Sequence, residues 1–353
     1  MREIQVDLGR IQTNYRTLKQ LAQPAKVMAV VKANAYGHGM HVVAQALEEI
    51  GVDALGVADL NEAIELRSAG IKTRIMCWLL QPSDDFQLAK DLEIELGVSS
   101  FEVLTKVLEV GVHHLHVKVD TGLGRNGFVQ ADWERLFSAL AGKSISLFSH
   151  LANTSEEADL KQQAEFEAAL EVASVHGVEV TERHLAATAG TLSYPAMRYE
   201  MVRVGIGVYG LNPDEREFAT FGLRPAMRVV ARVANFKRVE AGQGVSYGYR
   251  YVTQRPTNLI LVPFGYAEGM PRIAQGAKVL VAGKSFEISG RIAMDQFVVD
   301  VGDLEVSIGD EVVIFGDTEN GEPTAEELGA SYGSINYEVV TRIGGRAQRV
   351  YKK

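Results

Sequence analysis

The chain has 353 residues, of which 46% are hydrophobic and 23% are charged, values typical of a soluble globular protein. Its formal net charge of −9 argues against a nucleic-acid partner or an anionic membrane surface, since both would need a basic excess. Cys77 is the only cysteine, which excludes a disulfide framework or a thiolate metal site within one chain and fits a reducing cytoplasm. At this length we expect two domains, with one large α/β barrel as the alternative.

Residues 1–8 alternate polar and apolar side chains and lack the apolar core of a signal peptide. Nowhere in the chain do about eighteen apolar residues follow one another, as a membrane-spanning helix would need. We therefore expect neither secretion by a signal peptide nor a membrane span, and we expect a cytoplasmic protein. Residues 4–8 read as a half-exposed strand, and a short helix ends at residue 21.

From Val27 onward, short β-branched runs alternate with segments of helical periodicity. The predicted strands are 27–31, 54–57, 74–77, 93–97, 115–119, 145–149, 183–185 and 201–204. The predicted helices are 40–50, 60–69, 84–89, 101–108, 133–140 and 160–175. Eight strands close a (β/α)8 barrel, so we predict that fold, with a doubly wound open sheet as the alternative.

The sequence pattern changes from about Arg224, where β-branched segments are separated by glycine or acidic turns. The predicted strands here are 226–236, 258–264, 277–282, 285–288, 291–301 and 311–315, with short helical stretches near 326 and 336. The fold class is therefore α/β, a (β/α)8 barrel over 1–223 followed by a mostly β C-terminal domain over 224–353. Residues 212–215 are an alternative linker.

Lys32 follows the uninterrupted apolar run 27–31, which predicts a parallel strand buried on both faces. A lysine between such a strand and a glycine-rich turn enters a cleft, where burial lowers its pKa and exposes a nucleophilic amine. A Schiff-base lysine needs this property. The alternative is a solvated lysine that merely ends a strand.

Other polar residues also fall at predicted strand ends, and in a barrel of parallel strands these ends form the active site. They are Lys118 and Asp120, Arg125 in the following loop, His150, and Arg203. Each could be a structural polar residue by itself. Cationic groups that converge on one mouth repel one another unless an anionic ligand holds them.

The loops after the last two barrel strands, 187–190 and 204–207, contain the glycines with which barrels often bind phosphate through backbone N–H groups. Together with Lys32 across the mouth, they suggest a phosphorylated carbonyl cofactor. Pyridoxal 5′-phosphate is the simplest choice. No metal is implied.

Five ordered stretches of the chain resemble the alanine racemases, which are fold-type III pyridoxal-phosphate enzymes. They are AVVKANAYGHG at 29–39, KVDTGLGRNG at 118–127, VRVGI at 202–206, GYAEG at 265–269 and GRIAMDQ at 290–296. The resemblance implies that Lys32 carries the cofactor as a Schiff base and that Arg203, supported by His150, contacts the pyridine nitrogen. The implied phosphate contacts are Tyr36, Thr188, Gly205 and Ile206.

The resemblance also implies a homodimer in which Tyr266 of the partner subunit is the second catalytic base. Arg125 and Met294 would meet the substrate carboxylate. Supporting roles fall to Lys118, which matches a lysine that is carbamylated in some relatives, and to Arg291 and Asp295.

These residue types suit racemisation, which removes a proton from one face of Cα and returns one to the other. Two bases on opposite faces are the simplest machinery, and Lys32 and Tyr266 would be that pair. Arginine keeps its own proton, so Arg203 would leave the pyridine nitrogen unprotonated and limit side reactions of the carbanion.

Three positions depart from the pattern of many relatives. Ala187 stands where an asparagine is common, Ser155 where some carry an acidic residue near the active-site mouth, and Gly345 where some have a phosphate-contacting tyrosine. The predicted activity is interconversion of L- and D-alanine, with D-alanine supplied for peptidoglycan. A broader amino-acid racemase and a non-catalytic pyridoxal-phosphate carrier are the alternatives.

Overall fold

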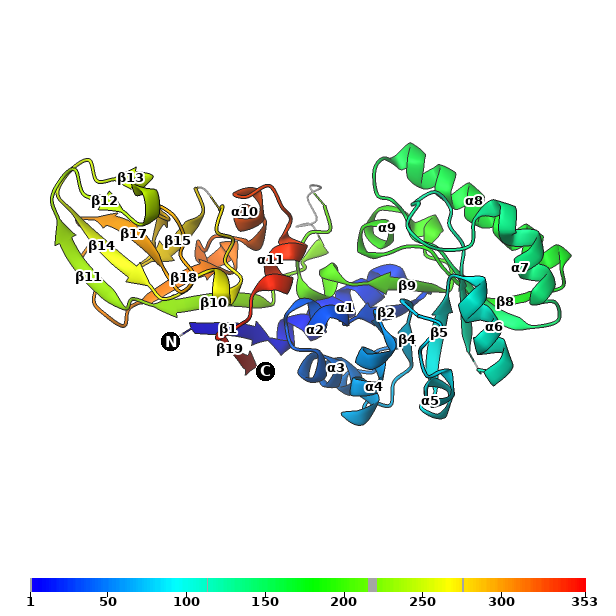
Figure 1. The fold of residues 1–353 in the computed structure, drawn as a ribbon. Helices are drawn as coiled ribbons and strands as arrows, with labels where there is room; N and C mark the ends of the chain where they lie inside the picture. Colours follow the sequence, from blue (N-terminus) through cyan, green and yellow to red (C-terminus); the bar gives the residue numbers. More distant parts are fainter. Residues whose placement is uncertain (1, 113, 215–220, 275) are drawn as a thin grey trace.

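The computed structural model describes residues 2–112, 114–214, 221–274 and 276–353. Figure 1 shows two parts joined end to end, a ring of strands and helices and a smaller part built mainly of strands. The predicted fold class, a (β/α)8 barrel followed by a mostly β domain, is confirmed.

Eight parallel strands form the barrel, in the order β8-β7-β6-β5-β4-β3-β2-β9. Their bounds are β2 (Lys26–Val30), β3 (Ala54–Val57), β4 (Ile75–Cys77), β5 (Ile94–Val98), β6 (Leu115–Lys118), β7 (Ser144–Phe148), β8 (Glu179–His184) and β9 (Met201–Val204). The backbone N–H of Arg203 donates to the carbonyl of Ala186 at 3.0 Å, which joins β9 to the end of β8. The doubly wound alternative is wrong, because the strand order never reverses about a central strand.

Helices cover the outside of this barrel (Figure 1). They are α1 (Leu8–Ala22), α3 (Met40–Glu49), α4 (Leu60–Ser68), α5 (Phe86–Asp91), α6 (Phe101–Val110), α7 (Trp133–Ala139) and α8 (Glu156–Val175). The short α2 (Lys32–Tyr36) and α9 (Thr188–Ser193) instead lie beyond the C-terminal ends of β2 and β8. Helix α1 ends at Ala22, one residue beyond the predicted end, and it begins at Leu8 because the Asp7 carboxylate accepts the N–H of Arg10 and caps it. Sequence analysis missed α9, which is too short to show a helical period.

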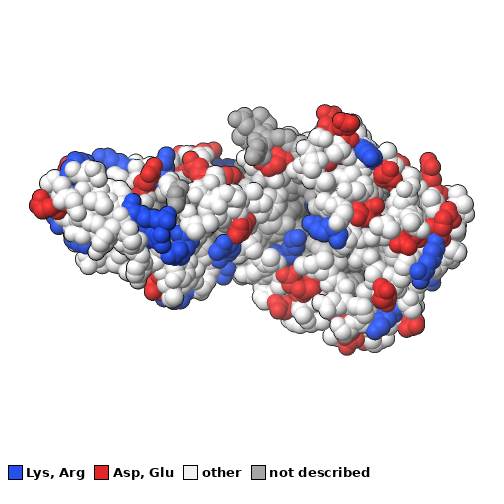
Figure 2. Space-filling model, turned by 45° about the horizontal axis from the view of Figure 1, so that its top comes forward, with Lys and Arg blue, Asp and Glu red and all other residues white. Residues whose placement is uncertain are grey.

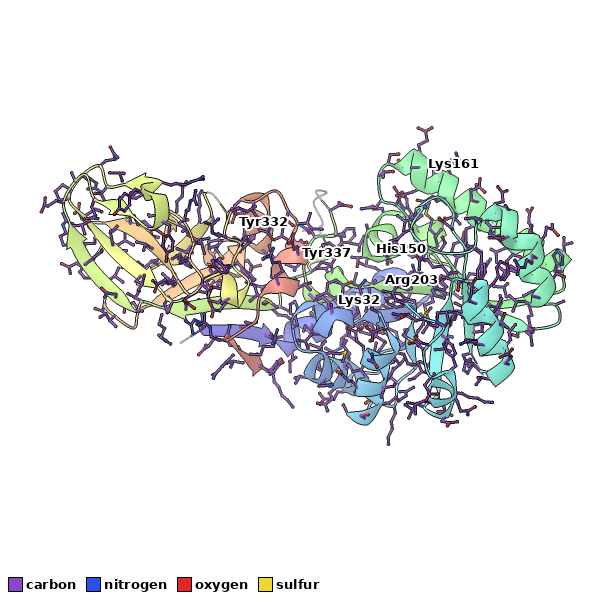
Figure 3. The ribbon with its side chains drawn as sticks, in the orientation of Figure 1. Lys32, His150, Lys161, Arg203, Tyr332 and Tyr337 are labelled. Atoms are coloured by element: carbon purple, nitrogen blue, oxygen red, sulfur yellow. The ribbon has the colours of Figure 1, made fainter. Side chains whose placement is uncertain are left out.

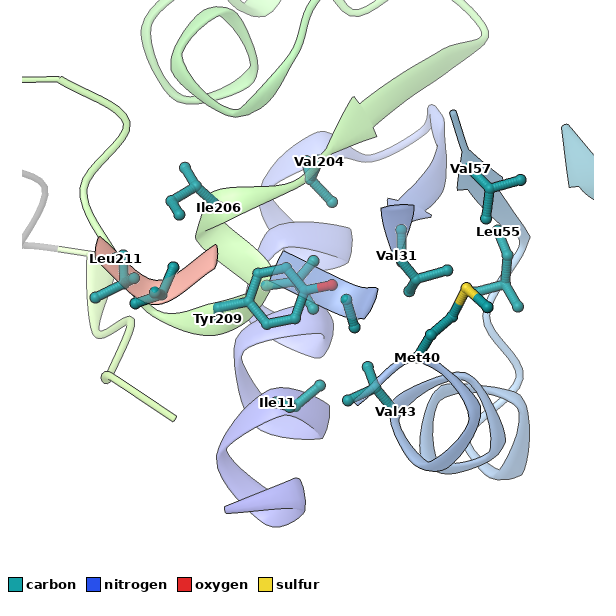
Figure 4. Packing of buried hydrophobic residues seen from close by; sticks show 14 of the residues in the cluster. Ile11, Val31, Met40, Val43, Leu55, Val57, Val204, Ile206, Tyr209 and Leu211 are labelled. Carbon is teal, nitrogen blue, oxygen red and sulfur yellow. The ribbon is translucent and has the colours of Figure 1, made fainter. Parts of the chain in front are cut away.

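A continuous apolar layer packs α1 and α3 against the strand that precedes Lys32 (Figure 4). Ile11, Val31, Val43 and Tyr209 are fully buried there. The Tyr209 hydroxyl donates to the carbonyl of Val30 at 2.9 Å. This packing fixes the end of β2, and therefore the place from which Lys32 projects.

The second part contains three sheets. The six-stranded sheet runs β16-β15-β18-β10-β1-β19, the three-stranded sheet β11-β14-β17, and the hairpin pairs β12 with β13. The bounds are β1 (Arg2–Asp7), β10 (Met227–Arg232), β11 (Asn235–Val239), β12 (Gly244–Val245), β13 (Tyr251–Val252), β14 (Thr257–Val262), β15 (Lys278–Val281), β16 (Lys284–Glu287), β17 (Phe297–Gly302), β18 (Glu311–Phe315) and β19 (Gln348–Lys352), with helices α10 (Ala325–Ala330) and α11 (Asn336–Arg342).

Strand β1 lies within the range predicted for the barrel, yet it pairs antiparallel with β10 and parallel with β19. Ile4 and Val6 are buried there, whereas their sequence neighbours are partly exposed. The polar and apolar alternation of this segment marks a strand buried on one face, unlike the strands of the barrel. The chain therefore starts in the second part and crosses to the barrel through α1.

Two predicted strands were too long. The segment 226–236 divides into β10 and the start of β11, and of 291–301 only the end is a strand, because 291–296 forms a loop. Glu215, the last residue of the alternative linker, lies outside the described residues.

Within the described ranges, no helix combines the length and the apolar character that crossing a membrane would require. Figure 2 shows acidic and basic side chains interspersed over the barrel half of the visible face.

Replacing Asn14 with alanine tests the junction between the two parts. The side chain is 1% exposed, donates to the carbonyls of Val208 and Arg224, and accepts the N–H of Arg224 at 3.0 Å. Asn14→Ala leaves these groups unpaired, so we expect a loss of about 2 to 4 kcal/mol in unfolding free energy. Urea unfolding measures it, with the exposed neighbour Thr13→Ala as control; equal stability of the two variants would contradict the role given to Asn14.

Candidate active site

A cavity of about 510 Å³ opens at the C-terminal ends of the barrel strands. Its wall carries Lys32, Lys118, Arg125, His150 and Arg203, and no aspartate or glutamate is among the described residues that line it. In Figure 3 the labelled Lys32, His150 and Arg203 gather where the barrel faces the second part of the chain. The predicted convergence of cationic groups is therefore present.

Lys32 begins α2 directly after the buried Val31. Burial lowers the pKa of its amine, the positive charge of Arg125 lowers it further, and Glu62 opposes both effects. The ammonium also lies 5.8 Å from the ring centroid of Trp78. A lysine whose neutral form is favoured in this way is a suitable nucleophile for an aldehyde.

The backbone after Lys32 forms a left-handed turn. The φ angles of Ala33, Asn34, Ala35 and Tyr36 are 51°, 55°, 54° and 52°. The left-handed conformation costs L-residues about 1 to 2 kcal/mol each, so this turn persists only because its surroundings hold it. The Asn34 side chain accepts the N–H of Met40 at 2.8 Å, which is one such restraint.

Tyr36 and Gly205 meet at the edge of the cavity where the phosphate was expected. A Cβ on Gly205 would overlap the Tyr36 hydroxyl, so the close approach requires glycine. The Thr188 hydroxyl accepts the N–H groups of Gly205 and Gly207, at 3.1 and 3.4 Å. Burial raises the pKa of Tyr36, which therefore keeps its proton and can donate a hydrogen bond to an anion.

Arg203 is buried and has no carboxylate partner among the described residues. Its Nη1 donates to the carbonyl of His184 at 2.7 Å and its Nη2 to the carbonyl of Ser149 at 2.7 Å. Nδ1 of His184 and Nδ1 of His150 each lie 3.1 Å from the guanidinium. Since a guanidinium only donates, both imidazoles present an unprotonated Nδ1 to it.

The protonation of His184 determines the proton positions of the next side chains in the barrel interior. Because Nδ1 of His184 accepts, its Nε2 carries the proton and donates to Nδ1 of His116 at 2.9 Å, and Nε2 of His116 then donates to Glu95 at 2.9 Å. Burial raises the pKa of Glu95, but hydrogen bonds from His116 and Arg74 outweigh it and lower the pKa to about 2. A chain of defined direction thus links a carboxylate inside the barrel to Arg203.

Lys118 lies beside this group, and its ammonium donates to the side chain of Asn126. Burial, followed by the charges of Arg203 and Arg125, lowers the pKa of Lys118 to about 8. The positive charges that gather in the cavity therefore lower the pKa of a neighbouring lysine.

The predicted site residues of the second part do not line this cavity. Tyr266 and Met294 are 39% and 53% exposed. The two segments that carry them are joined, because the N–H of Ala267 donates to the carbonyl of Met294 at 2.9 Å. Arg346 pairs with both Glu268 and Asp295, while Arg291 precedes the same loop.

Tyr337 of α11 was missed by the sequence analysis. It lines the cavity, and its ring centroid lies 6.1 Å from that of Tyr36. Gly345, by contrast, packs near the carbonyl of Ala267 and is not among the residues that line the cavity. No local pattern identifies Tyr337, because only the packing of α11 on α2 brings it here.

The other two departures behave differently. Ala187 lines the cavity without offering a polar side-chain group, whereas Ser155 caps α8 by accepting the N–H of Ala158.

The groups that line the cavity suit a phosphorylated aldehyde. They combine an amine of lowered pKa, a tyrosine hydroxyl and a glycine loop for the phosphate, and buried cations that need a counter-charge.

Two family models together match almost the whole chain. The model described as "Alanine racemase, N-terminal domain" matches residues 6–213, and that described as "Alanine racemase, C-terminal domain" matches residues 226–351.

Named relatives agree. The alanine racemase of Thermobifida fusca is 44% identical over 99% of this chain and 97% of its own length. The crystal structure of alanine racemase from D-cycloserine producing Streptomyces lavendulae is 43% identical, with a TM-score of 0.96 over 100% of this chain and 97% of that one. Alanine racemase from Streptomyces coelicolor A3(2) is 39% identical, with a TM-score of 0.95 over 99% and 97%.

The buried histidines predict loss of stability in mild acid. Burial lowers the pKa of His38 to about 4 and those of His150 and His184 well below their ordinary value. The unfolded chain binds these protons below about pH 6.5 and the folded chain does not, so stability falls as pH drops through that value. The slope approaches roughly 4 kcal/mol per pH unit if all three contribute. Urea unfolding at pH 7.5, 6.5 and 5.5 measures it, and a flat profile would contradict neutral buried histidines.

Proposed function

The chain belongs to the alanine racemase family, and we propose that Lys32 and Tyr266 are the two bases that exchange the Cα proton of alanine. The enzyme is a pyridoxal-phosphate-dependent racemase that interconverts L- and D-alanine. When bound, the cofactor supplies an electron sink that makes the Cα proton acidic. All other tasks, namely binding, orientation and movement of the proton, fall to the side chains.

The observation that carries the assignment of Lys32 is the amine of lowered pKa at the cationic end of the barrel. Lys32 would hold the cofactor, and its amine would remove or return a proton on one face of Cα. Tyr36, Thr188, Gly205 and Ile206 hold the phosphate. Arg125 and Met294 orient the substrate carboxylate, with Lys118, Arg291 and Asp295 as supporting residues.

Arg203 would contact the pyridine nitrogen and would leave it unprotonated, because the guanidinium keeps its own protons. Its remaining N–H groups are occupied by carbonyls and by the two neutral imidazoles of His150 and His184. His150 therefore supports the orientation of Arg203. A non-catalytic carrier is disfavoured, since the family match extends over the second part of the chain.

We also propose a cytoplasmic homodimer with shared active sites, which supplies D-alanine for peptidoglycan. Support for the dimer comes from the exposure of Tyr266 and Met294 and of the nearby apolar Tyr247, Tyr249 and Ile273, which a monomer would leave in water. In this arrangement the barrel, residues 1–223, binds the cofactor, and residues 224–353 complete the partner's site. Strand β1 is the exception, since it belongs to the sheet of the second part.

Replacing Lys32 with alanine tests the cofactor lysine. We expect the purified protein to show a cofactor absorbance at longer wavelength than the protein's own band. Borohydride should fix the cofactor permanently to the protein. Lys32→Ala should lose the absorbance, the borohydride-fixed cofactor and the activity. Lys161→Ala, which removes an exposed lysine on α8, should behave as wild type. A borohydride-fixed cofactor on the Lys32→Ala protein, located by peptide mass, would refute the assignment.

Mixed dimers test the shared site. Lys32→Ala and Tyr266→Phe chains, each nearly inactive, are unfolded together and refolded. About half the dimers are then mixed, and each mixed dimer has one site with both residues intact, so activity recovers to roughly a quarter of wild type if subunits pair without bias. If heterodimers are confirmed by mass and activity stays at the level of the separate mutants, the site does not lie across two subunits.

A further inference from the structure

The left-handed turn after Lys32 needs an anchor at its first peptide, because that peptide sets the direction in which the lysine side chain leaves the backbone. Ala33 carries no side chain that could cap it, and its φ of 51° lies in the left-handed region. The restraint through Asn34 acts near the far end of the turn. The first peptide is held from another element.

That element is α4, which contributes Glu62. One carboxylate oxygen, Oε1, accepts the N–H of Ala33 at 2.6 Å, and the other, Oε2, accepts the N–H of Ala58 at 2.8 Å. Ala58 directly follows β3, the neighbour of β2 in the barrel. The carboxylate therefore bridges the lysine turn to the rigid end of the adjacent strand, with both oxygens used and charge-assisted bonds on each.

We propose that Glu62 is a positioning residue for Lys32. It holds the lysine toward the cavity through the peptide of Ala33, and its negative charge counters the positive charges that surround the lysine amine. This inference rests on the proposed function of Lys32. It adds a residue that is not itself among those lining the cavity, since Glu62 reaches the wall through the backbone N–H of Ala33.

The second part of the proposal concerns charge. Lys32 is faced by the positive Arg125 and by Trp78, and its charge acts in turn on Lys118 and His150, while Glu62 is the acidic group that favours its protonated form. Glu62 thus opposes the desolvation and the repulsion that the cationic cavity imposes on the amine. Removal of the charge should make the Lys32 amine easier to deprotonate.

Three full-length variants separate position from charge. Glu62→Ala removes both hydrogen bonds and the charge, whereas Glu62→Gln removes the charge but keeps one acceptor oxygen. Glu65→Gln is the matched control, because Glu65 lies on the same helix, has a side chain that is 60% exposed, and has a carboxylate oxygen 3.8 Å from Nε2 of His41.

The first readout does not use the loaded enzyme. After the cofactor has been removed, Lys32 is trace-labelled by reductive methylation across a pH series, and the Lys32 peptide is quantified by mass spectrometry. We expect the midpoint of labelling to move to lower pH in both Glu62→Gln and Glu62→Ala, and to stay at the wild-type value in Glu65→Gln.

The second readout is kcat against KM of the holoenzyme. A misplaced lysine lowers kcat, and displacements near 1 Å cost about a hundredfold, so we expect a loss of about tenfold to a hundredfold in Glu62→Ala with KM little changed. Glu62→Gln should lose less, because its amide oxygen still accepts one of the two N–H groups.

Wild-type kcat and an unmoved labelling midpoint in both Glu62 variants would overturn the proposal, even if their melting temperature fell, since that result describes a purely structural residue. Failure of the role proposed for Lys32 would be seen in a different variant. If Lys32→Ala, measured in parallel, kept the cofactor and its activity, Lys32 would not be the cofactor lysine, whereas the labelling shift would still report whether Glu62 acts on it.

Discussion

A buried guanidinium that no carboxylate of the described residues faces is the constraint on which the site depends. Arg203 is compensated by carbonyl oxygens and by two imidazole nitrogens, and each of these partners must accept a hydrogen bond. The requirement fixes the proton positions on His184 and then on His116, and it ends at Glu95. A barrel interior is usually filled by apolar layers. Here the interior also contains a directed polar chain, and the hydrogen bonds along it make it rigid.

The lysine turn depends on both halves of the chain. From the barrel side it is held by α4 and by the start of α3. From the other side, Nε of Arg349 donates to the carbonyl of Gly37 at 2.7 Å, and the Tyr351 hydroxyl closes on Gly39, where a side chain would collide with it. The C-terminal segment thus supports the geometry of a residue more than three hundred positions earlier in the sequence.

The barrel was predictable because its signals are local. Buried strands such as β2 are short apolar runs, and the loops that follow them carry the polar residues, so Lys32, His150 and Arg203 could be placed on one face before the fold was known. The left-handed turn was not predictable, since Ala-Asn-Ala-Tyr contains no glycine to announce a positive φ. Tyr337 and Glu62 were missed because tertiary packing alone brings them to the turn after Lys32, where they meet Tyr36 and Ala33.

Strand β1 lies between β10 and β19, so the first and last strands of the chain are parallel neighbours in one sheet. In the barrel, in contrast, β2 to β8 each pair with the next strand in sequence, and only β9 returns to pair with β2. On a ribosome, the barrel strands can pair as they emerge, whereas β1 is made first and must wait for the final residues before its sheet is complete. The barrel is therefore built mainly from contacts between successive strands, whereas the sheet of the second part is completed by a contact that spans the chain.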